Sequence, residues 1–136
     1  MKVLVVAEDL GVRSALTCVV KYFGWESHGC NQHADAAVLI EQLEIDVVLV
    51  DHAMLGVDGL EVVRRIRSRN VKVPVVLMSP SERINSATMK RLAISKVIPK
   101  PPNLKGMKAA LEAAASPNPD SITSLLPAGS ISQEPP

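Results

Sequence analysis

The sequence predicts an α/β fold, a doubly wound parallel sheet of five strands with helices between them. Two observations lead to this prediction. Short apolar runs of strand length alternate with segments whose apolar residues recur at helical spacing, and the alternation occurs five times before residue 116. A repeated βα order favours parallel strands, because parallel pairing needs a crossover connection and the crossover is usually a helix.

The first two βα units occupy residues 3–43. The apolar run 3–7 predicts a buried strand, and residues 11–23 predict an amphipathic helix that stops at Gly24. A short strand near Glu26 to Cys30 then leads to a second helix from about residue 34 to residue 43. The apolar faces of these helices comprise Val12, Leu16, Val19, Val20 and Phe23 in the first and Ala37, Ile40 and Leu43 in the second.

The remaining three units follow the same order. Buried strands are expected at 45–50 and 73–78, and a short strand at 96–98. A helix after Asp58, which is well placed to cap it, has Leu60, Val63 and Ile66 as its apolar stripe. A weaker helix over 83–93 and an Ala-rich helix over 104–115 complete the pattern.

Residues 1–115 are therefore expected to form one domain, and residues 116–136 a separate Pro- and Ser-rich tail. Five prolines fall within this tail, a composition that favours a flexible segment. Its only apolar cluster is Ile122, Leu125 and Leu126. We expect no DNA-binding or catalytic output domain after residue 115, so the activity would be exerted by binding another protein.

Polar side chains follow four of the predicted strands at the point where each strand ends. Glu8 and Asp9 follow the first, Asp51 the third, Ser79 the fourth and Lys100 the fifth. The carboxyl ends of the strands of an open parallel sheet line one crevice, so we expect these side chains to converge there. Each residue taken singly is unremarkable, but the combination predicts a functional site.

The chemistry of this set suits phosphoryl transfer. Carboxylate oxygens are the ligands that Mg²⁺ prefers, and Glu8, Asp9 and Asp51 could supply them. A bound cation would relieve the repulsion among three carboxylates and neutralise an incoming phosphoryl group. Asp51 could act as the nucleophile that forms an acyl phosphate, and Ser79 would hydrogen-bond a phosphoryl oxygen. Lys100 adds a further positive charge.

Residues 1 to about 115 resemble a response regulator receiver domain of the single-domain chemotaxis type. The matching stretches are VLVVAED (3–9), VVLVD (47–51) with the loop to Gly59, PVVLMS (74–79) and VIPKP (97–101). The resemblance implies a flavodoxin-like fold, (βα)5, with strand order 2-1-3-4-5.

The resemblance also implies the roles of the site residues. Asp51 would accept a phosphoryl group from the phosphohistidine of a histidine kinase or phosphotransfer protein. Glu8, Asp9, Asp51 and the backbone carbonyl of Ala53 would hold Mg²⁺. Ser79 and Lys100 would bind the phosphoryl oxygens, and a cis peptide before Pro101 would aim Lys100 into the site.

A receiver domain of this kind is not a conventional enzyme. The resemblance implies Mg²⁺-dependent self-phosphorylation from phosphohistidine, followed by autodephosphorylation. The expected partners are a histidine kinase or phosphotransfer protein, a downstream protein target that the sequence does not identify and, through weak self-association, a second copy of the chain.

Three positions depart from the pattern of that family. Leu55 stands where the family usually has Pro, and Pro80 stands where it favours a small residue. Val97 replaces the Tyr or Phe that commonly rotates as a switch. A rotating aromatic side chain cannot operate at position 97. We therefore expect phosphorylation to shift residues 79–100 through the Ser79 hydroxyl and through loop movement.

Three alternatives compete with a phosphorylated switch. The first is a receiver-like interaction module that works without phosphorylation, which Val97 and Pro80 favour. The second is a flavin-binding protein, which the few aromatic residues oppose. The third is an aspartate-nucleophile phosphohydrolase, which would be expected to carry an acid where Ala53 stands.

Composition excludes several other classes of function. A formal charge of +1 is too mild to predict direct nucleic-acid binding, and 2% aromatic residues give little for base stacking. The apolar runs are far shorter than the ~20 residues of a membrane span, so we expect a cytoplasmic protein without membrane contact. Cys18 and Cys30 are expected to be buried reduced thiols. The arginines at 64, 65, 67 and 69 surround an apolar stripe, and we expect them to form a solvated helix face.

Overall fold

The computed structural model describes residues 1–52, 58–80 and 84–116. Five parallel strands form one sheet in the order β2-β1-β3-β4-β5, as the sequence and the resemblance predicted. The strands are β1 (Lys2–Val6), β2 (Glu26–Cys30), β3 (Val47–Asp51), β4 (Val75–Ser79) and β5 (Ile94–Pro99). The helices are α1 (Leu10–Tyr22), α2 (Ala36–Leu43), α3 (Gly59–Ser68), α4 (Ser86–Leu92) and α5 (Leu104–Ala115).

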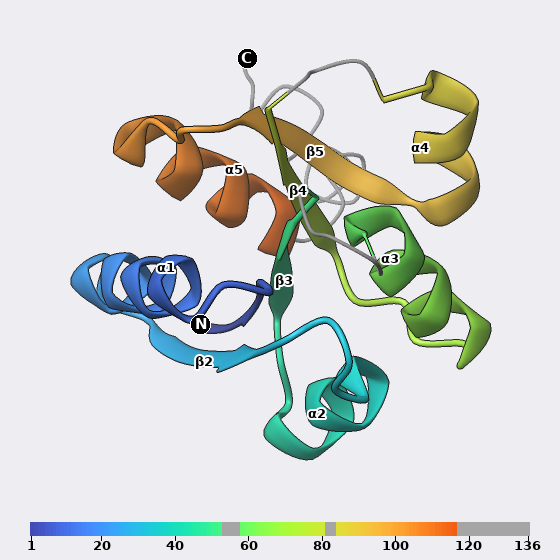
Figure 1. The fold of residues 1–136 in the computed structure, drawn as a ribbon, viewed down its shortest axis with the longest axis horizontal. Helices are drawn as coiled ribbons and strands as arrows, with labels where there is room; N and C mark the ends of the chain where they lie inside the picture. Colours follow the sequence, from blue (N-terminus) through green and yellow to red (C-terminus); the bar gives the residue numbers. More distant parts are fainter. Residues whose placement is uncertain (53–57, 81–83, 117–136) are drawn as a thin grey trace, which may run out of the picture.

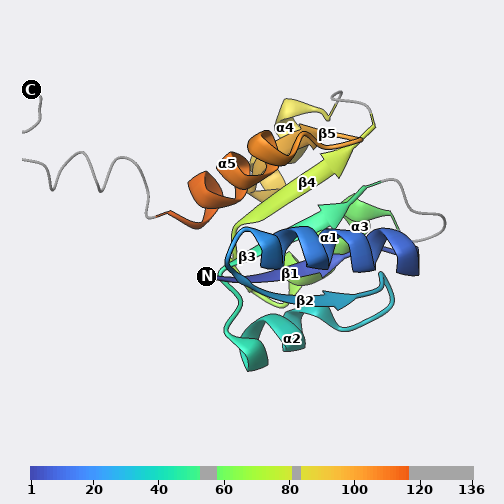
Figure 2. The same cartoon turned by 90° about the vertical axis from the view of Figure 1, so that its left-hand side faces the viewer.

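Helices cover both faces of the sheet. Helices α1 and α5 lie on one face, and α2, α3 and α4 lie on the other (Figure 1). The view turned by 90° shows the strands running side by side toward one common edge (Figure 2). The candidate site residues follow the strands at that edge.

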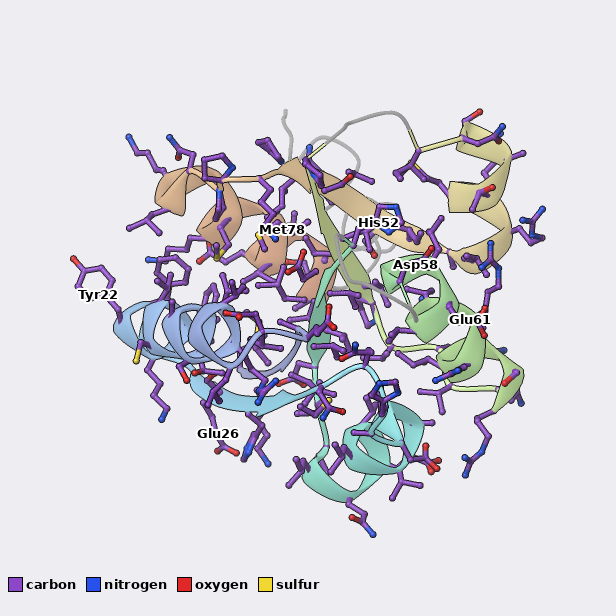
Figure 3. The ribbon with its side chains drawn as sticks, viewed as in Figure 1. Tyr22, Glu26, His52, Asp58, Glu61 and Met78 are labelled. Atoms are coloured by element: carbon purple, nitrogen blue, oxygen red, sulfur yellow. The ribbon has the colours of Figure 1, made fainter. Side chains whose placement is uncertain are left out.

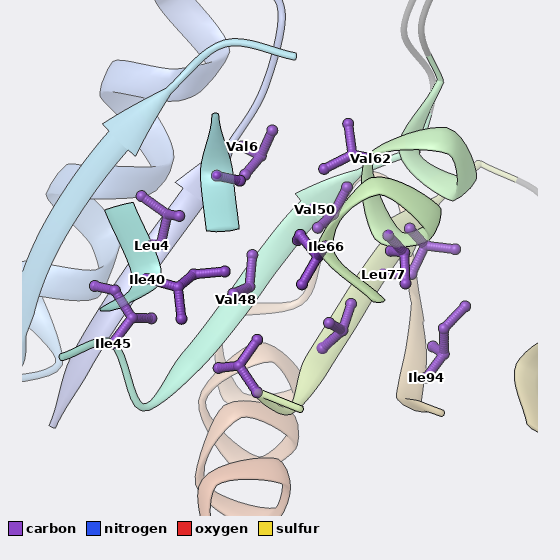
Figure 4. Close-up of a cluster of buried hydrophobic side chains, with 14 of the residues drawn as sticks. Leu4, Val6, Ile40, Ile45, Val48, Val50, Val62, Ile66, Leu77 and Ile94 are labelled. Atoms are coloured by element: carbon purple, nitrogen blue, oxygen red, sulfur yellow. The ribbon is translucent and has the colours of Figure 1, made fainter. Parts of the chain in front are cut away.

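The core follows from the alternation of side chains along the strands. Leu4, Val48 and Leu77 point to the α2–α3 side (Figure 4), whereas Val5, Leu49 and Val76 point to the α1–α5 side. Strands β1, β3 and β4 are apolar at nearly every position because both of their faces are buried.

Each helix begins after an Asp or Asn whose side chain accepts a hydrogen bond from an N–H of the first turn. Such a cap satisfies one of the backbone donors that a helix start leaves without a partner. Asp58 fills this position for α3, as predicted. The other caps are Asp9, Asp35, Asn85 and Asn103.

The fifth strand and the third helix differ in detail from the prediction. Strand β5 extends over Ile94–Pro99 rather than 96–98, because pairing with β4 continues beyond the apolar residues and passes an irregular step between Val75 and Val76. Val62 is buried in α3, whereas Leu60 is only partly buried. The true stripe is therefore Val62, Val63 and Ile66.

Two predictions about single side chains were wrong. Cys18 is exposed on α1, although Cys30 is buried as expected. Arg67 does not belong to a solvated face, because its guanidinium donates to the carbonyls of Leu92, Val71, Val73 and Ala93 at 2.8–3.1 Å. Position 18 lies outside the apolar face predicted for residues 11–23, in agreement with the exposure of Cys18. Helical spacing gave no indication of the Arg67 contacts, since it does not report where a long side chain ends.

The helices in the described ranges are too short and too polar to cross a bilayer.

Candidate functional site

Strand register brings the predicted site residues to one edge of the sheet. Val6 pairs with Val50, Asp51 with Met78, and Ser79 with Pro99. The residues that follow β1, β3, β4 and β5 therefore emerge side by side. Asp51 and Ser79 are buried, with 3% and 1% of their surface exposed, so their polar groups lie within the sheet edge rather than in bulk water.

Asp51 and Lys100 form an ion pair. The Lys100 Nζ donates to Oδ1 of Asp51 at 3.1 Å and to Oδ2 at 3.0 Å. The peptide bond between Lys100 and Pro101 is cis, as the resemblance implied. The lysine side chain is partly exposed, whereas that of Asp51 is buried.

Glu8 and Asp9 lie just beyond the end of β1 and are exposed. Asp9 has a structural task, since its Oδ2 accepts from the Val12 N–H at 2.9 Å and caps α1. In the described residues, the His, Cys, Asp and Glu side chains do not gather in groups of three or more that could hold a metal ion. The structure thus brings Asp51 and Lys100 into contact and leaves the acidic pair at the rim of the same edge.

The other predicted positions are distributed around this pair. Val97 is partly buried and packs against the core on the α2–α4 side of the sheet, and Pro80 is exposed after β4. Ala53 and Leu55 lie outside the described residues. His52 lies beside the start of α3 (Figure 3), where its Nδ1 is buried and has no hydrogen-bond partner among the residues that the structure describes.

Sequence reasoning missed one residue that contacts this edge. The Arg13 guanidinium donates to the carbonyl of Ala7 at 2.8 Å and to that of Glu8 at 3.3 Å. A basic residue one helical turn after the acidic pair was the available signal. Spacing alone does not distinguish such a contact from an exposed cation.

An apolar cavity of about 270 Å³ adjoins the site between α1 and α5. It is lined by Val12, Leu16, Met78, Lys100, Pro101 and Met107, among others. Leu104 also lines the cavity and is 48% exposed. Leu10, two residues before Val12 in the sequence, is 67% exposed. The cavity beside Lys100 therefore has a largely apolar lining.

Comparison with protein families gives a match over residues 3–112 to the response regulator receiver domain. The chain belongs to the response regulator receiver domain family. The strand order, the buried aspartate after β3 and the lysine after β5 are thus found in a receiver domain, as the sequence motifs indicated.

Two solved structures resemble this receiver domain in fold. Chemotaxis protein CheY4 of Vibrio cholerae superimposes with a TM-score of 0.73 at 19% identity, over 83% of this chain and 97% of the other. The Francisella response regulator 1452 receiver domain gives a TM-score of 0.72 at 21% identity, over 84% and 95% of the two chains.

Curated relatives match this receiver domain over a part of their own length. The regulatory protein AtoC of Escherichia coli is 30% identical over 63% of this chain and 19% of its own. A protein-glutamate methylesterase/protein-glutamine glutaminase of Nocardioides is 34% identical over 71% of this chain and 27% of its own. The chain thus spans about a fifth and about a quarter of these two relatives.

Proposed function

We propose that the chain acts as a response regulator whose Asp51 accepts a phosphoryl group from the phosphohistidine of a histidine kinase or phosphotransfer protein. The observation that supports this most directly is the pairing of a buried carboxylate at the end of β3 with a lysine from the end of β5. The phosphorylated domain would then signal by binding another protein.

In the transfer step, a carboxylate oxygen of Asp51 attacks the phosphorus atom. The P–N bond to the donor imidazole breaks as the P–O bond of an acyl phosphate forms, and the imidazole leaves with the bonding electron pair. Autodephosphorylation is the later attack of water on the same phosphorus, which returns Asp51 and releases inorganic phosphate. Both carboxylate oxygens accept from Lys100 before the transfer step, so the oxygen that attacks would exchange its contact with Lys100 for the bond to phosphorus.

Mg²⁺ would be held at this edge by one or two of the carboxylates of Glu8, Asp9 and Asp51. Carboxylate oxygens are hard ligands, and Mg²⁺ keeps several waters, so it does not need three gathered carboxylates. The carbonyl of Ala53, outside the described residues, would be a further ligand. Bound Mg²⁺ would neutralise negative charge on the phosphoryl oxygens.

Ser79 and Lys100 would contact the transferred group. Lys100 already contacts the Asp51 carboxylate, and its ammonium group would hydrogen-bond the negatively charged phosphoryl oxygens after transfer. Ser79, buried on the strand between β3 and β5, would donate its hydroxyl proton to another of them. Because Val97 offers no aromatic ring to rotate, movement of residues 79–100 would have to begin at the Ser79 hydroxyl.

A second candidate function is a receiver domain that binds its partner without phosphorylation. Val97 favours it, because a small side chain that is already partly buried changes the surface little when it moves. The presence of Glu8, Asp9, Asp51 and Lys100 together opposes it, because binding without phosphorylation does not require this combination of residues.

The deciding experiment is incorporation of phosphate from acetyl phosphate or phosphoramidate with Mg²⁺, followed by intact mass. We expect the wild type to gain one phosphoryl group and Asp51→Asn to gain none. Asp46→Asn is the matched control, because Asp46 is exposed and accepts from the Lys2 N–H at the opposite end of the strands. No gain in the wild type, together with no Mg²⁺ binding, would favour the phosphate-independent module.

A further inference from the structure

Arg13 holds the backbone of the loop that carries the acidic pair. Its guanidinium Nη1 donates to the Ala7 carbonyl at 2.8 Å and to the Glu8 carbonyl at 3.3 Å. Its own backbone N–H donates to the Asp9 carbonyl at 2.9 Å. One residue of α1 therefore binds three consecutive carbonyls, those of residues 7, 8 and 9.

We infer that Arg13 is a positioning residue for the Mg²⁺ ligands Glu8 and Asp9, an inference that rests on the proposed function. The side-chain hydrogen bonds of Arg13 go to backbone carbonyls and not to the carboxylates of Glu8 and Asp9. Fixing the backbone on either side of them reduces the conformational freedom that metal binding would otherwise have to remove. Residues that orient metal ligands from outside commonly change metal affinity by about tenfold or more.

Gly29 provides the space that Arg13 needs. A Cβ at position 29 would lie 3.0 Å from the Arg13 Cγ and 3.3 Å from its Cδ, and 3.2 Å from the Thr17 Cγ2. The stem of Arg13 thus passes directly over β2 at the residue that pairs with Val5. A branched side chain at position 29 would push the stem away from β2 without altering any group that contacts the loop.

Two substitutions distinguish the positioning effect of Arg13 from the effect of its positive charge. Arg13→Lys keeps the positive charge, but the lysine Nζ lies one bond nearer the main chain than the Arg13 Nη1 and lacks the rigid planar guanidinium, so it cannot place a donor at the same position between the two carbonyls. Gly29→Val leaves every charge of the protein unchanged. Removing the charge of Arg13 outright would be harder to interpret, because a lost cation by itself favours binding of another cation.

Arg67 offers a matched control for general loss of stability. It also donates to several backbone carbonyls, but they belong to the α3–β4 and α4–β5 connections at the other end of the strands. Arg67→Lys should lower the stability of the fold and leave Mg²⁺ affinity unchanged. A purely structural role for Arg13 would give the same result.

The test measures Mg²⁺ affinity by isothermal titration calorimetry and amide hydrogen exchange across residues 7–13, on the full chain. We expect Arg13→Lys to weaken Mg²⁺ binding by about tenfold and Gly29→Val to weaken it in the same direction. Both should also speed exchange across this loop more than Arg67→Lys does. The double variant should bind no more weakly than Arg13→Lys, because Gly29→Val acts through Arg13.

The outcomes separate this inference from the proposed function. Equal Mg²⁺ affinity in wild type and Arg13→Lys would overturn the inference and leave the proposed function standing. If Arg67→Lys weakened Mg²⁺ binding as much as Arg13→Lys does, the inference would be overturned as well. A wild type that binds no Mg²⁺ would refute the proposed function, whereas unchanged exchange across residues 7–13 in Arg13→Lys would refute the positioning of the loop whether or not Mg²⁺ binds.

Discussion

Lys100 and Asp51 join two strands that are not neighbours in the sheet. Asp51 ends β3, Lys100 follows β5, and β4 lies between them. The pair therefore crosses the end of β4, where Ser79 lies buried. A phosphoryl group on Asp51 would enter a space that is already bounded by a cation and a hydroxyl-bearing residue.

Removing the lysine should destabilise the fold. We expect Lys100→Met to lower the free energy of unfolding by about 2 kcal/mol, because a buried carboxylate loses its cation. The cost should stay below that of a fully buried pair, since 29% of the lysine side chain is exposed. Urea denaturation without Mg²⁺ measures it. In an Asp51→Asn background the cost should fall below about 1 kcal/mol, and an equal cost in both backgrounds would contradict the pairing.

Ser79 should affect phosphorylation without affecting metal binding. Ser79→Ala removes one hydrogen bond to the phosphoryl group, which we expect to slow phosphate incorporation by about tenfold, equivalent to ~1.4 kcal/mol. Mg²⁺ affinity should stay unchanged because the hydroxyl is not a proposed ligand. Ser95→Ala, at an exposed position of β5, is the control. A parallel loss of Mg²⁺ affinity would show that Ser79 acts on the metal instead.

Two helical glycines should respond in opposite directions to alanine. At Gly59 a Cβ would lie 2.7 Å from the Cα of His52, so Gly59→Ala should cost about 1–3 kcal/mol of stability. At Gly106 the nearest atom would be 3.7 Å away, so Gly106→Ala should add about 0.5–1 kcal/mol by favouring helix. Thermal unfolding of both variants checks this, and a stabilised Gly59→Ala would refute the close approach of α3 to β3.

Cys30 should make stability depend on pH in the alkaline range. Burial raises the pKa of the Cys30 thiol to about 11. In the unfolded chain the thiol ionises at a lower pH, so the unfolded state holds fewer protons than the folded state between that pH and pH 11. The contribution of Cys30 is therefore present at neutral pH and is lost as pH rises through this window.

The measurement for Cys30 is the difference in unfolding free energy between wild type and Cys30→Val from pH 8 to pH 11. We expect the stability of the wild type relative to Cys30→Val to fall as pH rises. Cys18→Ala serves as the control, because Cys18 is exposed and its profile should parallel that of the wild type. Parallel profiles for Cys30→Val as well would refute the buried thiol.

The elements of the fold could be predicted because each strand is a distinct apolar run. Residues 3–6, 47–50 and 75–78 are apolar without a break. They lie at the centre of the sheet, where side chains on both faces are buried. Strand β2 was also located, although Glu26 and Ser27 are polar, because it falls between two helical patterns. The extent of β5 was underestimated by Ile94, Ser95 and Pro99, since Ser95 and Pro99 are exposed and carry no signal of a buried strand.

The candidate site could be predicted only as a set of residues at one edge. Parallel strands bring their ends together whatever the side chains are, so Asp51 and Lys100 could be placed near each other in advance. Their direct contact could not, because it depends on the path of a long side chain. The contacts of Arg13 and Arg67 could not be predicted for the same reason, and because their partners are carbonyl groups that the sequence does not distinguish.

The carbonyl contacts of Arg67 also bear on how α4 could move. They attach the carboxyl end of α4, at Leu92 and Ala93, to the connection before β4, at Val71 and Val73. At the amino end, the Asn85 side chain caps the helix by accepting from the N–H groups of Ala87 and Thr88. Arg67 thus anchors the carboxyl end of α4. A displacement that begins near Ser79 would be largest at the exposed amino end of this helix.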